Sequence, residues 1–241
     1  MIMFTPKFIK NISFNGERIR AIGRSGKETS VFVGQGDLDG SCSIYSLMMM
    51  LILHKKLDRN DLTDKKRAAE NDFVFSIQRI FLQKFNGLCK GGHKIKDISN
   101  KLNICFNAKL SETYTIIRGK RNTVFRPALH KMIKYNLDNG RPVMIGFRRE
   151  KGGGHSVVVI GYYRQGRKKM RLFCLDPGRP LGYMQIWNNV IDLDYFQLFD
   201  DVYTDYNYYA ESKIIVDEIL IINDPPEQDL PFKPESNKIP F

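Results

Sequence analysis

The stretch Gly152-Gly153-Gly154-His155-Ser156-Val157-Val158-Val159-Ile160-Gly161-Tyr162-Tyr163 carries the strongest structural signal in this chain of 241 residues. Its β-branched and aromatic residues, bounded by glycines, predict a largely buried β-strand. The strand begins at a histidine, and the glycines before it let the backbone approach closely and leave room for a ligand. A histidine at the start of an apolar strand is more often structural than catalytic, so its role depends on its neighbours.

Two further strands are expected on either side of this one, at Arg141–Phe147 and Lys169–Leu175. The connections between the three are basic or glycine-rich, which favours consecutive antiparallel pairing. The last of them runs into Asp176-Pro177-Gly178, so a carboxylate follows the strand next to the one that carries His155. Asp-Pro-Gly is also a common turn in which the aspartate bonds its own backbone. Asp176 is therefore a candidate partner for the imidazole.

A buried helix is expected from the apolar run Ile44–Leu53, which contains no helix breaker and is apolar on most sides. Ser41 is a suitable N-cap, and this places Cys42 in the first turn. The reactive form of a cysteine is the thiolate, which a helix N-terminus and an adjacent imidazolium both favour. A cysteine at a buried helix start is otherwise usually a small core residue.

Together these residues form a recognisable order of a thiol, an imidazole and a carboxylate. Cys42 would be the nucleophile, His155 the general base and acid, and Asp176 the acid that orients the imidazole. Gln35 precedes the cysteine, and its side-chain amide could stabilise the oxyanion together with the Cys42 backbone N–H. Each residue alone has an ordinary structural explanation, but the combination predicts thiol-mediated acyl transfer to water.

The sequence resembles the papain-like cysteine peptidase superfamily, and it is most similar to the branch that contains the peptidases that process bacteriocin leaders. The resemblance covers roughly residues 33–180, and its more specific half is the histidine strand and the strand ending in Asp176-Pro177. It implies a papain-like α+β fold in which a central helix bearing the cysteine packs on a twisted antiparallel β-sheet. It also implies the same four roles for Cys42, His155, Asp176 and Gln35.

Two features differ from that branch. Gln35 lies one residue further from the cysteine, and Ser41 and Ser43 flank Cys42 where the branch usually has aspartate and glycine. The string Asp39-Gly40-Ser41-Cys42 is also similar to ovarian-tumour-type deubiquitinases, although the context of His155 is not.

We expect a single papain-like catalytic domain over residues 1–223, with a β-rich lead-in at 1–34, and a proline-rich extended tail at 224–241. Strands are expected in the lead-in at Phe8–Phe14 and Ser30–Val33.

Other elements follow from apolar spacing. Residues 58–86 are expected to be helical, shorter helices are expected at Ile95–Leu102 and Leu129–Leu137, and a closing strand is expected at Ile214–Ile222.

The chain is basic, with 38 Lys and Arg against 26 Asp and Glu and a net charge of +12. Such a surface attracts anionic partners, among them nucleic acid, phospholipid headgroups and acidic cell-wall polymer. The basic clusters are scattered and accompany no zinc-finger or RNA-recognition signature, so no specific nucleic-acid partner is expected. The expected partner is a protein or peptide substrate.

The 4 cysteines lie far apart without a Cys-x-x-Cys pair, which indicates neither a disulfide framework nor a zinc module. Cys89, His93 and Cys105 offer three ligands in loose spacing, and no metal or cofactor is predicted. The longest apolar run, Leu47–Leu53, is too short to span a bilayer, and the N-terminus lacks a hydrophobic leader. We expect a cytoplasmic protein or one exported by a leaderless specialised route.

Three alternatives remain open at this point. A transglutaminase- or deamidase-like bacterial effector would use the same triad on a target glutamine, and a peptidoglycan amidase toxin would suit the basic surface. The third alternative is a catalytically inactive scaffold that binds a partner, in which Cys42 would react with thiol reagents no faster than the other cysteines.

Overall fold

The structure is a computed structural model of the chain. It describes residues 5–35, 41–63, 73–83, 93–105, 111–115, 125–150, 152–165, 169–194, 201–205 and 210–223. The expected tail at 224–241 lies outside the described residues.

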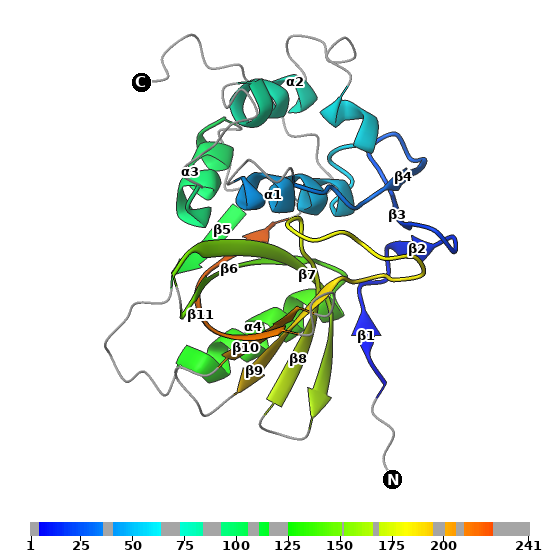
Figure 1. Cartoon of the computed structure of the whole chain (residues 1–241). Helices are drawn as coiled ribbons and strands as arrows, with labels where there is room; N and C mark the ends of the chain where they lie inside the picture. Colours follow the sequence, from blue (N-terminus) through cyan, green and yellow to red (C-terminus); the bar gives the residue numbers. More distant parts are fainter. Residues whose placement is uncertain are drawn as a thin grey trace.

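An antiparallel β-sheet that closes on itself forms the lower half of the molecule in Figure 1. Its strands are β1 (Lys7–Phe8), β5 (Ser111–Thr115), β6 (Val143–Arg149), β7 (Gly154–Gln165), β8 (Lys169–Leu175), β9 (Asn189–Asp194), β10 (Asp201–Asp205) and β11 (Ala210–Ile222). The order is β1-β7-β6-β11-β10-β9-β8, with β5 also paired to β11. Because β8 pairs with β7 as well as with β9, strands β6 to β11 form a closed barrel.

Bulges in the two longest strands accompany this closure. The register shifts between Val159 and Gly161 on β7, and between Val216 and Glu218 on β11. A bulge bends its strand and increases the local twist, which lets a sheet curl back on itself. Gly161 also lies under β1, where an added Cβ would be 2.6 Å from the Lys7 carbonyl oxygen. The close approach of β1 therefore requires glycine at this position.

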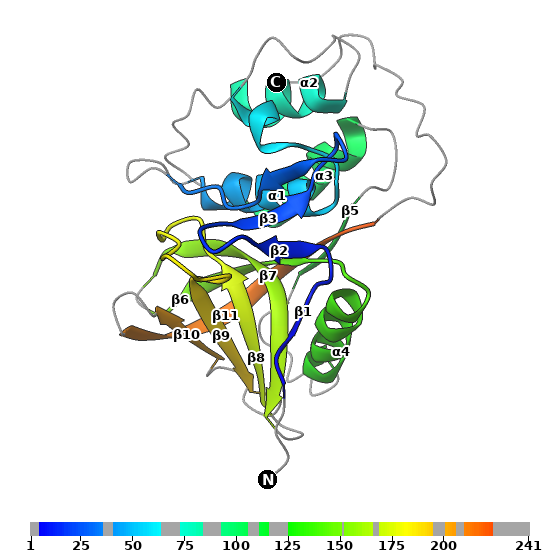
Figure 2. The same ribbon diagram turned by 90° about the vertical axis from the view of Figure 1, so that its right-hand side faces the viewer.

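Helix α1 (Cys42–Leu53) packs against β7 and β6 of the barrel and against β3 on another side (Figure 2). Its residues from Leu47 to Leu53 are at most 1% exposed, as expected for a helix that is apolar on most sides. The predicted α+β fold, with a helix that begins at the cysteine and packs on an antiparallel sheet, is confirmed.

The lead-in forms a separate three-stranded sheet of β2 (Ile12–Phe14), β3 (Ile19–Ile22) and β4 (Glu28–Ser30). The single strand expected at Phe8–Phe14 is wrong, because a turn separates β1 from β2. In that turn the Asn11 side-chain amide donates to the Leu53 carbonyl oxygen at 2.6 Å, which satisfies the C-terminal end of α1. The expected strand at Ser30–Val33 is also mostly wrong, since β4 ends at Ser30.

The remaining helices are α2 (Phe73–Ile77), which continues as a π-helix (Gln78–Gln83), α3 (Ile95–Cys105), α4 (Phe125–Asp138) and a 3-10 turn (Arg59–Leu62). Helices α1, α2 and α3 lie above the barrel in Figure 1, and α4 packs beside it against β7, β1 and β6. The helical stretch expected at 58–86 is thus interrupted, with residues 64–72 and 84–86 outside the described part. None of the described helices combines the length and apolar character of a membrane span.

Candidate active site

Cys42 is the first residue of α1, and its side chain is half-buried. Ser41 occupies the N-cap position, and its carbonyl oxygen accepts the N–H groups of Ile44 at 2.8 Å and Tyr45 at 3.1 Å. The Ser41 side chain makes no capping hydrogen bond, and the first turn contains no acidic residue. The positive end of the helix is therefore directed toward the cysteine without a carboxylate in the first turn to offset it.

His155 is the second residue of β7, opposite Phe147 on β6. The two rings meet edge to face, with 5.6 Å between their centroids. The turn before His155 contains Gly152 and Gly153 at φ +90° and +83°, which is the left-handed region that favours glycine. The glycine run therefore has a structural cause: it lets the chain reverse immediately before the histidine.

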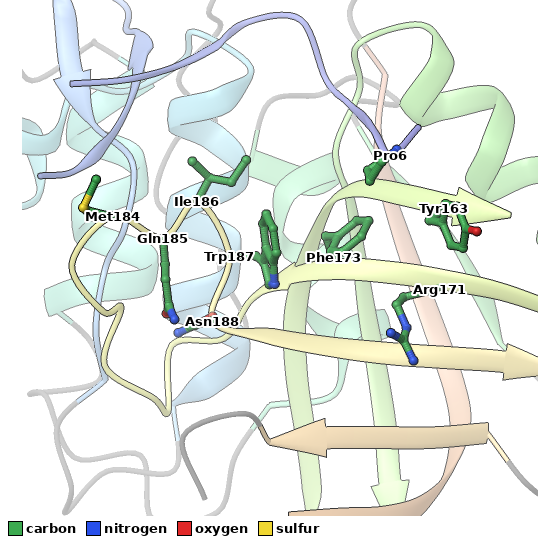
Figure 3. A pocket seen from close by; sticks show the side chains of 9 residues that line it. All are labelled: Pro6, Tyr163, Arg171, Phe173, Met184, Gln185, Ile186, Trp187 and Asn188. Atoms are coloured by element: carbon green, nitrogen blue, oxygen red, sulfur yellow. The ribbon is translucent and has the colours of Figure 1, made fainter. Parts of the chain in front are cut away.

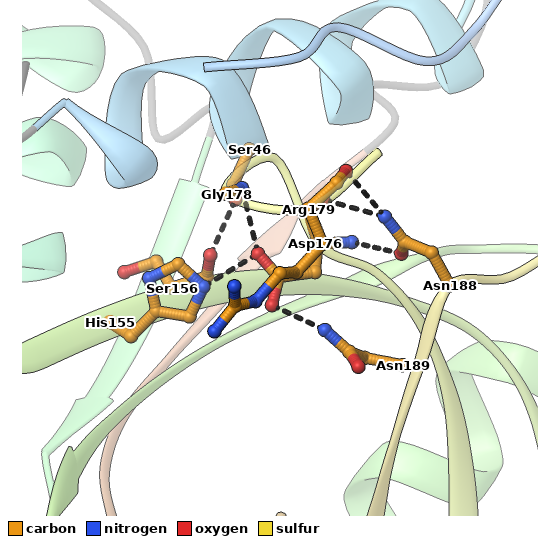
Figure 4. Close-up of polar contacts among 8 residues, drawn as sticks. All are labelled: Ser46, His155, Ser156, Asp176, Gly178, Arg179, Asn188 and Asn189. Atoms are coloured by element: carbon orange, nitrogen blue, oxygen red, sulfur yellow. Dashed lines mark hydrogen bonds and ion pairs between the residues drawn. The ribbon is translucent and has the colours of Figure 1, made fainter. Parts of the chain in front are cut away.

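Asp176 follows β8 directly and is completely buried. Its Oδ1 lies 2.6 Å from Nε2 of His155 (Figure 4). The same oxygen accepts the Gly178 N–H at 2.8 Å, and Oδ2 accepts the side-chain amide of Asn189 at 2.6 Å. Both carboxylate oxygens are thus satisfied without water, which is what a buried charge requires.

Asn188 and Asn189 complete this arrangement at the start of β9, and the sequence reasoning missed both of them. The Asn188 side chain accepts the Asp176 N–H at 2.7 Å and donates to the Asp176 carbonyl oxygen at 2.8 Å. The two asparagines are at most 2% exposed. Two consecutive asparagines before an apolar strand were the available signal, but asparagine is common in turns and the pattern alone is unspecific.

The Cys42 side chain also hydrogen-bonds with His155. Burial alone lowers the pKa of His155, but the hydrogen bonds with Asp176 and Cys42 outweigh burial and raise the pKa to about 9. An imidazole with this pKa is protonated at neutral pH. The structure therefore places the His155 imidazole in contact with both the Cys42 side chain and the Asp176 carboxylate.

A buried hydrogen bond joins α1 to β7 close to Cys42 and His155. The Ser46 hydroxyl donates to the Ser156 carbonyl oxygen at 3.0 Å (Figure 4). Ser46 lies four residues after Cys42, on the same face of the helix, and Ser156 follows His155 in the strand. The bond therefore holds the helix and the strand in register close to the cysteine and the histidine.

Gln35 lies beside the turn that follows Asp176, because its backbone N–H donates to the Pro177 carbonyl oxygen at 2.7 Å. Residues 36–40, which connect it to the helix, lie outside the described part. Gly178 in the same turn is close to the imidazole, since an added Cβ would be 3.2 Å from Cε1 of His155. A role of Gln35 at the oxyanion stays a prediction.

The loop between β8 and β9 contributes to two cavities, and none of their lining residues is Cys42, His155 or Asp176. The larger, of about 850 Å³, lies against the outer face of the sheet (Figure 3). It contains an aromatic group in which Phe173 and Trp187 have ring centroids 4.8 Å apart, and Asn188 is part of its wall. The smaller, of about 530 Å³, is bounded by the lead-in and by Pro180, Leu181 and Tyr183.

Among the residues that the structure describes, no three His, Cys, Asp or Glu side chains are grouped to bind a metal ion. Of the loosely spaced trio considered from the sequence, Cys89 and the side chain of Cys105 lie outside the described part. The second described free cysteine, Cys174, is buried, and burial raises the pKa of its thiol.

Comparison with known protein families shows a match over most of the chain. The sequence profile of the family described as Peptidase_C39 like matches residues 31–211, which is well over half of the chain. The matched region contains α1, the strands that carry His155 and Asp176, and both asparagines. No curated protein is significantly similar to the chain.

Proposed function

This chain belongs to the Peptidase_C39 like family, and on that basis we propose that it is a cysteine peptidase acting through Cys42, His155 and Asp176. The family agrees with the resemblance seen in the sequence, and it implies a peptide substrate. The proposal goes further than the family in naming the catalytic residues and the reaction, which is hydrolysis of a peptide or amide bond.

One observation carries the assignment of roles. The Nε2 of His155 lies 2.6 Å from a completely buried carboxylate, while the same ring bonds the Cys42 side chain. Since Nε2 faces Asp176, Nδ1 is the ring nitrogen that remains for the sulfur. Protonated His155 beside the sulfur favours a thiolate–imidazolium pair, which is the reactive state of a cysteine peptidase.

The reaction then proceeds in two steps. The Cys42 thiolate attacks the carbonyl carbon, an S–C bond forms, and Nδ1 of His155 gives its proton to the leaving amine as the C–N bond breaks. In the second step His155 takes a proton from water, whose oxygen attacks the acyl-enzyme and releases the acid and the thiolate. Asp176 stays ionised throughout, holds the Nε2–H and stabilises the imidazolium.

The oxyanion that forms in each step needs hydrogen-bond donors. The backbone N–H of Cys42 belongs to the first turn of α1, where N–H groups have no intrahelical partner. The side-chain amide of Gln35 is the second donor that we propose, supported by the position of its backbone beside Pro177. Losing one such donor typically costs about 10²- to 10³-fold in turnover.

The deciding experiment compares wild type with Cys42→Ala on a whole proteome, reading new peptide termini and mass changes together. New termini that appear only with wild type support hydrolysis. Glutamine-to-glutamate conversions without new termini would replace hydrolysis by deamidation. Identical products from the two proteins would remove the assignment of Cys42 altogether.

A thiol-labelling comparison separates the enzyme from an inactive scaffold. Iodoacetamide should modify Cys42 much faster than Cys174, which is buried and whose thiol pKa is raised by burial. Equal slow labelling of both cysteines in the folded protein would favour the scaffold.

A further inference from the structure

The smaller cavity beside the β8–β9 loop contains two arginines, Arg18 and Arg59. Its wall consists of described residues from three parts of the chain, namely Glu17, Arg18, Ser30, Phe32, Arg59, Pro180, Leu181 and Tyr183. The volume of about 530 Å³ suits one or two amino-acid side chains of a bound peptide.

Two segments of chain connect the cavity with the candidate active site. Phe32 lies three residues before Gln35, whose N–H bonds the Pro177 carbonyl oxygen, and Pro180 lies four residues after Asp176. An extended chain advances by at most about 3.6 Å per residue. Phe32 is therefore at most about 11 Å from Gln35, and Pro180 at most about 14 Å from Asp176, so we take the cavity to lie within about six extended residues of the bond to be cut.

The charge in the cavity is not balanced. In the described part of the chain, the guanidinium groups of Arg18 and Arg59 form no ion pair, and Glu17 is the one acidic residue on the wall. Burial lowers the pKa of Arg59, Tyr45 opposes this, and the nearby charge of Arg18 adds to it. Two cations held close together in a recess favour an anion between them.

We propose that this cavity is a subsite for an acidic side chain, Asp or Glu, of the peptide substrate. The inference rests on the proposed peptidase function and specifies the substrate that the function acts on.

The cavity wall offers hydrogen-bond donors to the carboxylate of an Asp or Glu side chain and apolar contacts to its methylene groups. A guanidinium group binds a carboxylate through two parallel N–H···O bonds, and the Ser30 hydroxyl lies in the same recess as a further donor. Phe32 and Leu181 provide apolar contact for the methylene groups. Tyr183 is 87% exposed in the unliganded chain, so a bound peptide would cover a large apolar side chain that is now in water.

Arg59 should contribute more than Arg18. Its backbone is fixed, since its N–H donates to the Thr29 hydroxyl at 2.9 Å and it lies within the capping box formed by Asp58 and Asp61. Arg59 is half-buried, whereas Arg18 is exposed and its charge is more screened by water. The net charge of +12 would in addition speed the approach of acidic peptides.

The test compares two variants that lose the same charge. Arg18→Gln/Arg59→Gln alters the cavity, and Lys131→Gln/Lys169→Gln removes two exposed cations from α4 and from the far end of β8. Both pairs are made in the Cys42→Ala protein, which is immobilised and exposed to a proteome-derived peptide library. We expect the arginine variant to retain about tenfold fewer peptides with Asp or Glu than the lysine variant, as expected for the loss of a charge-assisted bond.

The same pairs in the active protein show where the acid lies relative to the cut. Wild type should produce Cys42-dependent termini with Asp or Glu enriched at one position within about six residues of the cut, and the arginine variant should lose that preference. If Arg59→Gln impairs folding, as thermal unfolding would show, Arg18→Glu alone should weaken the preference for acids.

The outcomes distinguish a failure of the proposed hydrolysis from a failure of the proposed acidic subsite. Absence of Cys42-dependent termini would overturn hydrolysis, while arginine-dependent retention of acidic peptides would still support the acid-binding site. Equal losses in the arginine and lysine variants, or no acidic enrichment in either measurement, would overturn the subsite.

Discussion

On the barrel side of the site both oxygens of Asp176 accept hydrogen bonds, from His155, Gly178 and Asn189, and the residue is completely buried. On the helix side Cys42 is half-buried, and its N-cap Ser41 makes no side-chain capping bond. The proposed base, His155, is therefore oriented by a carboxylate that several contacts hold, whereas the chemistry of the proposed nucleophile, Cys42, depends on single groups. This difference predicts that losing one hydrogen bond to Asp176 costs less than losing one group that serves the nucleophile. Removing the Asp176 charge itself, to which all of these contacts are made, should cost most.

Asp176→Asn should have the largest effect, because it removes the charge that the whole barrel-side network holds. The side chain keeps its volume, but the amide no longer stabilises the imidazolium. We expect kcat/KM to fall by about 10³- to 10⁴-fold with little change in secondary structure. The measurement is turnover of a peptide identified from wild-type cleavage, and a loss below tenfold would show that the carboxylate does not support the base.

Gln35→Ala tests a single group that we propose to act at the nucleophile, although its backbone lies beside the turn after Asp176. Loss of one oxyanion donor should lower kcat by about 10²-fold or more while KM changes little, because the interaction exists mainly in the transition state. Gln35→Glu removes the amide donor and keeps the shape, so it should be impaired as strongly. Full activity of both variants would assign the oxyanion to other donors.

Asn189→Ala should reduce kcat/KM by about 10- to 100-fold, less than Gln35→Ala, because Oδ1 of Asp176 still bonds His155 and Gly178. The unpaired Oδ2 should also lower the free energy of unfolding by about 1–3 kcal/mol. Asn139→Ala at the exposed end of α4 is the matched control and should leave activity unchanged. If Asn189→Ala were more harmful than Gln35→Ala, the barrel-side contacts would not support one another as we describe.

Ser46→Ala should have the smallest effect. It removes the bond to the Ser156 carbonyl oxygen that joins α1 to β7, so we expect a loss of about 1 kcal/mol in unfolding free energy and a few-fold loss in kcat. Ser43→Ala is the control on the same helix, because the buried Ser43 hydroxyl has no hydrogen-bond partner among the described residues. Equal denaturation midpoints of the two variants would show that the bond does not fasten the helix.

The parts of the fold that follow from local patterns were predictable. The apolar run after Cys42 fixed a buried helix, and β6 and β8 begin and end within two residues of the expected strands. The barrel was not predictable, because the pairing of β8 with both β7 and β9 depends on contacts remote in sequence. The split of the first expected strand depends on the bond from Asn11 to Leu53, which joins residues far apart in the chain.

The same distinction applies to the site. Cys42, His155 and Asp176 could be singled out from the sequence because thiol, imidazole and carboxylate are rare in combination and lie at the ends of recognisable elements. Asn188 and Asn189 contact Asp176 only because β9 starts next to the end of β8, and their residue type gives no hint of this. The arginine cavity likewise joins three segments that no local pattern relates.

The pKa of His155 is the most direct measure of whether its imidazole contacts both Cys42 and Asp176. Its value of about 9 results from the bonds to Asp176 and Cys42, which outweigh burial. Because the pKa is raised, protonation of His155 stabilises the folded chain. This stabilisation is complete at pH values below the ordinary histidine pKa of 6.5, and it is lost as the pH rises through about 9. An NMR titration of the imidazole resonances should therefore give a pKa near 9 in wild type and a clearly lower value in Cys42→Ala and in Asp176→Asn. A wild-type pKa at or below 6.5 that neither substitution moves would contradict the account.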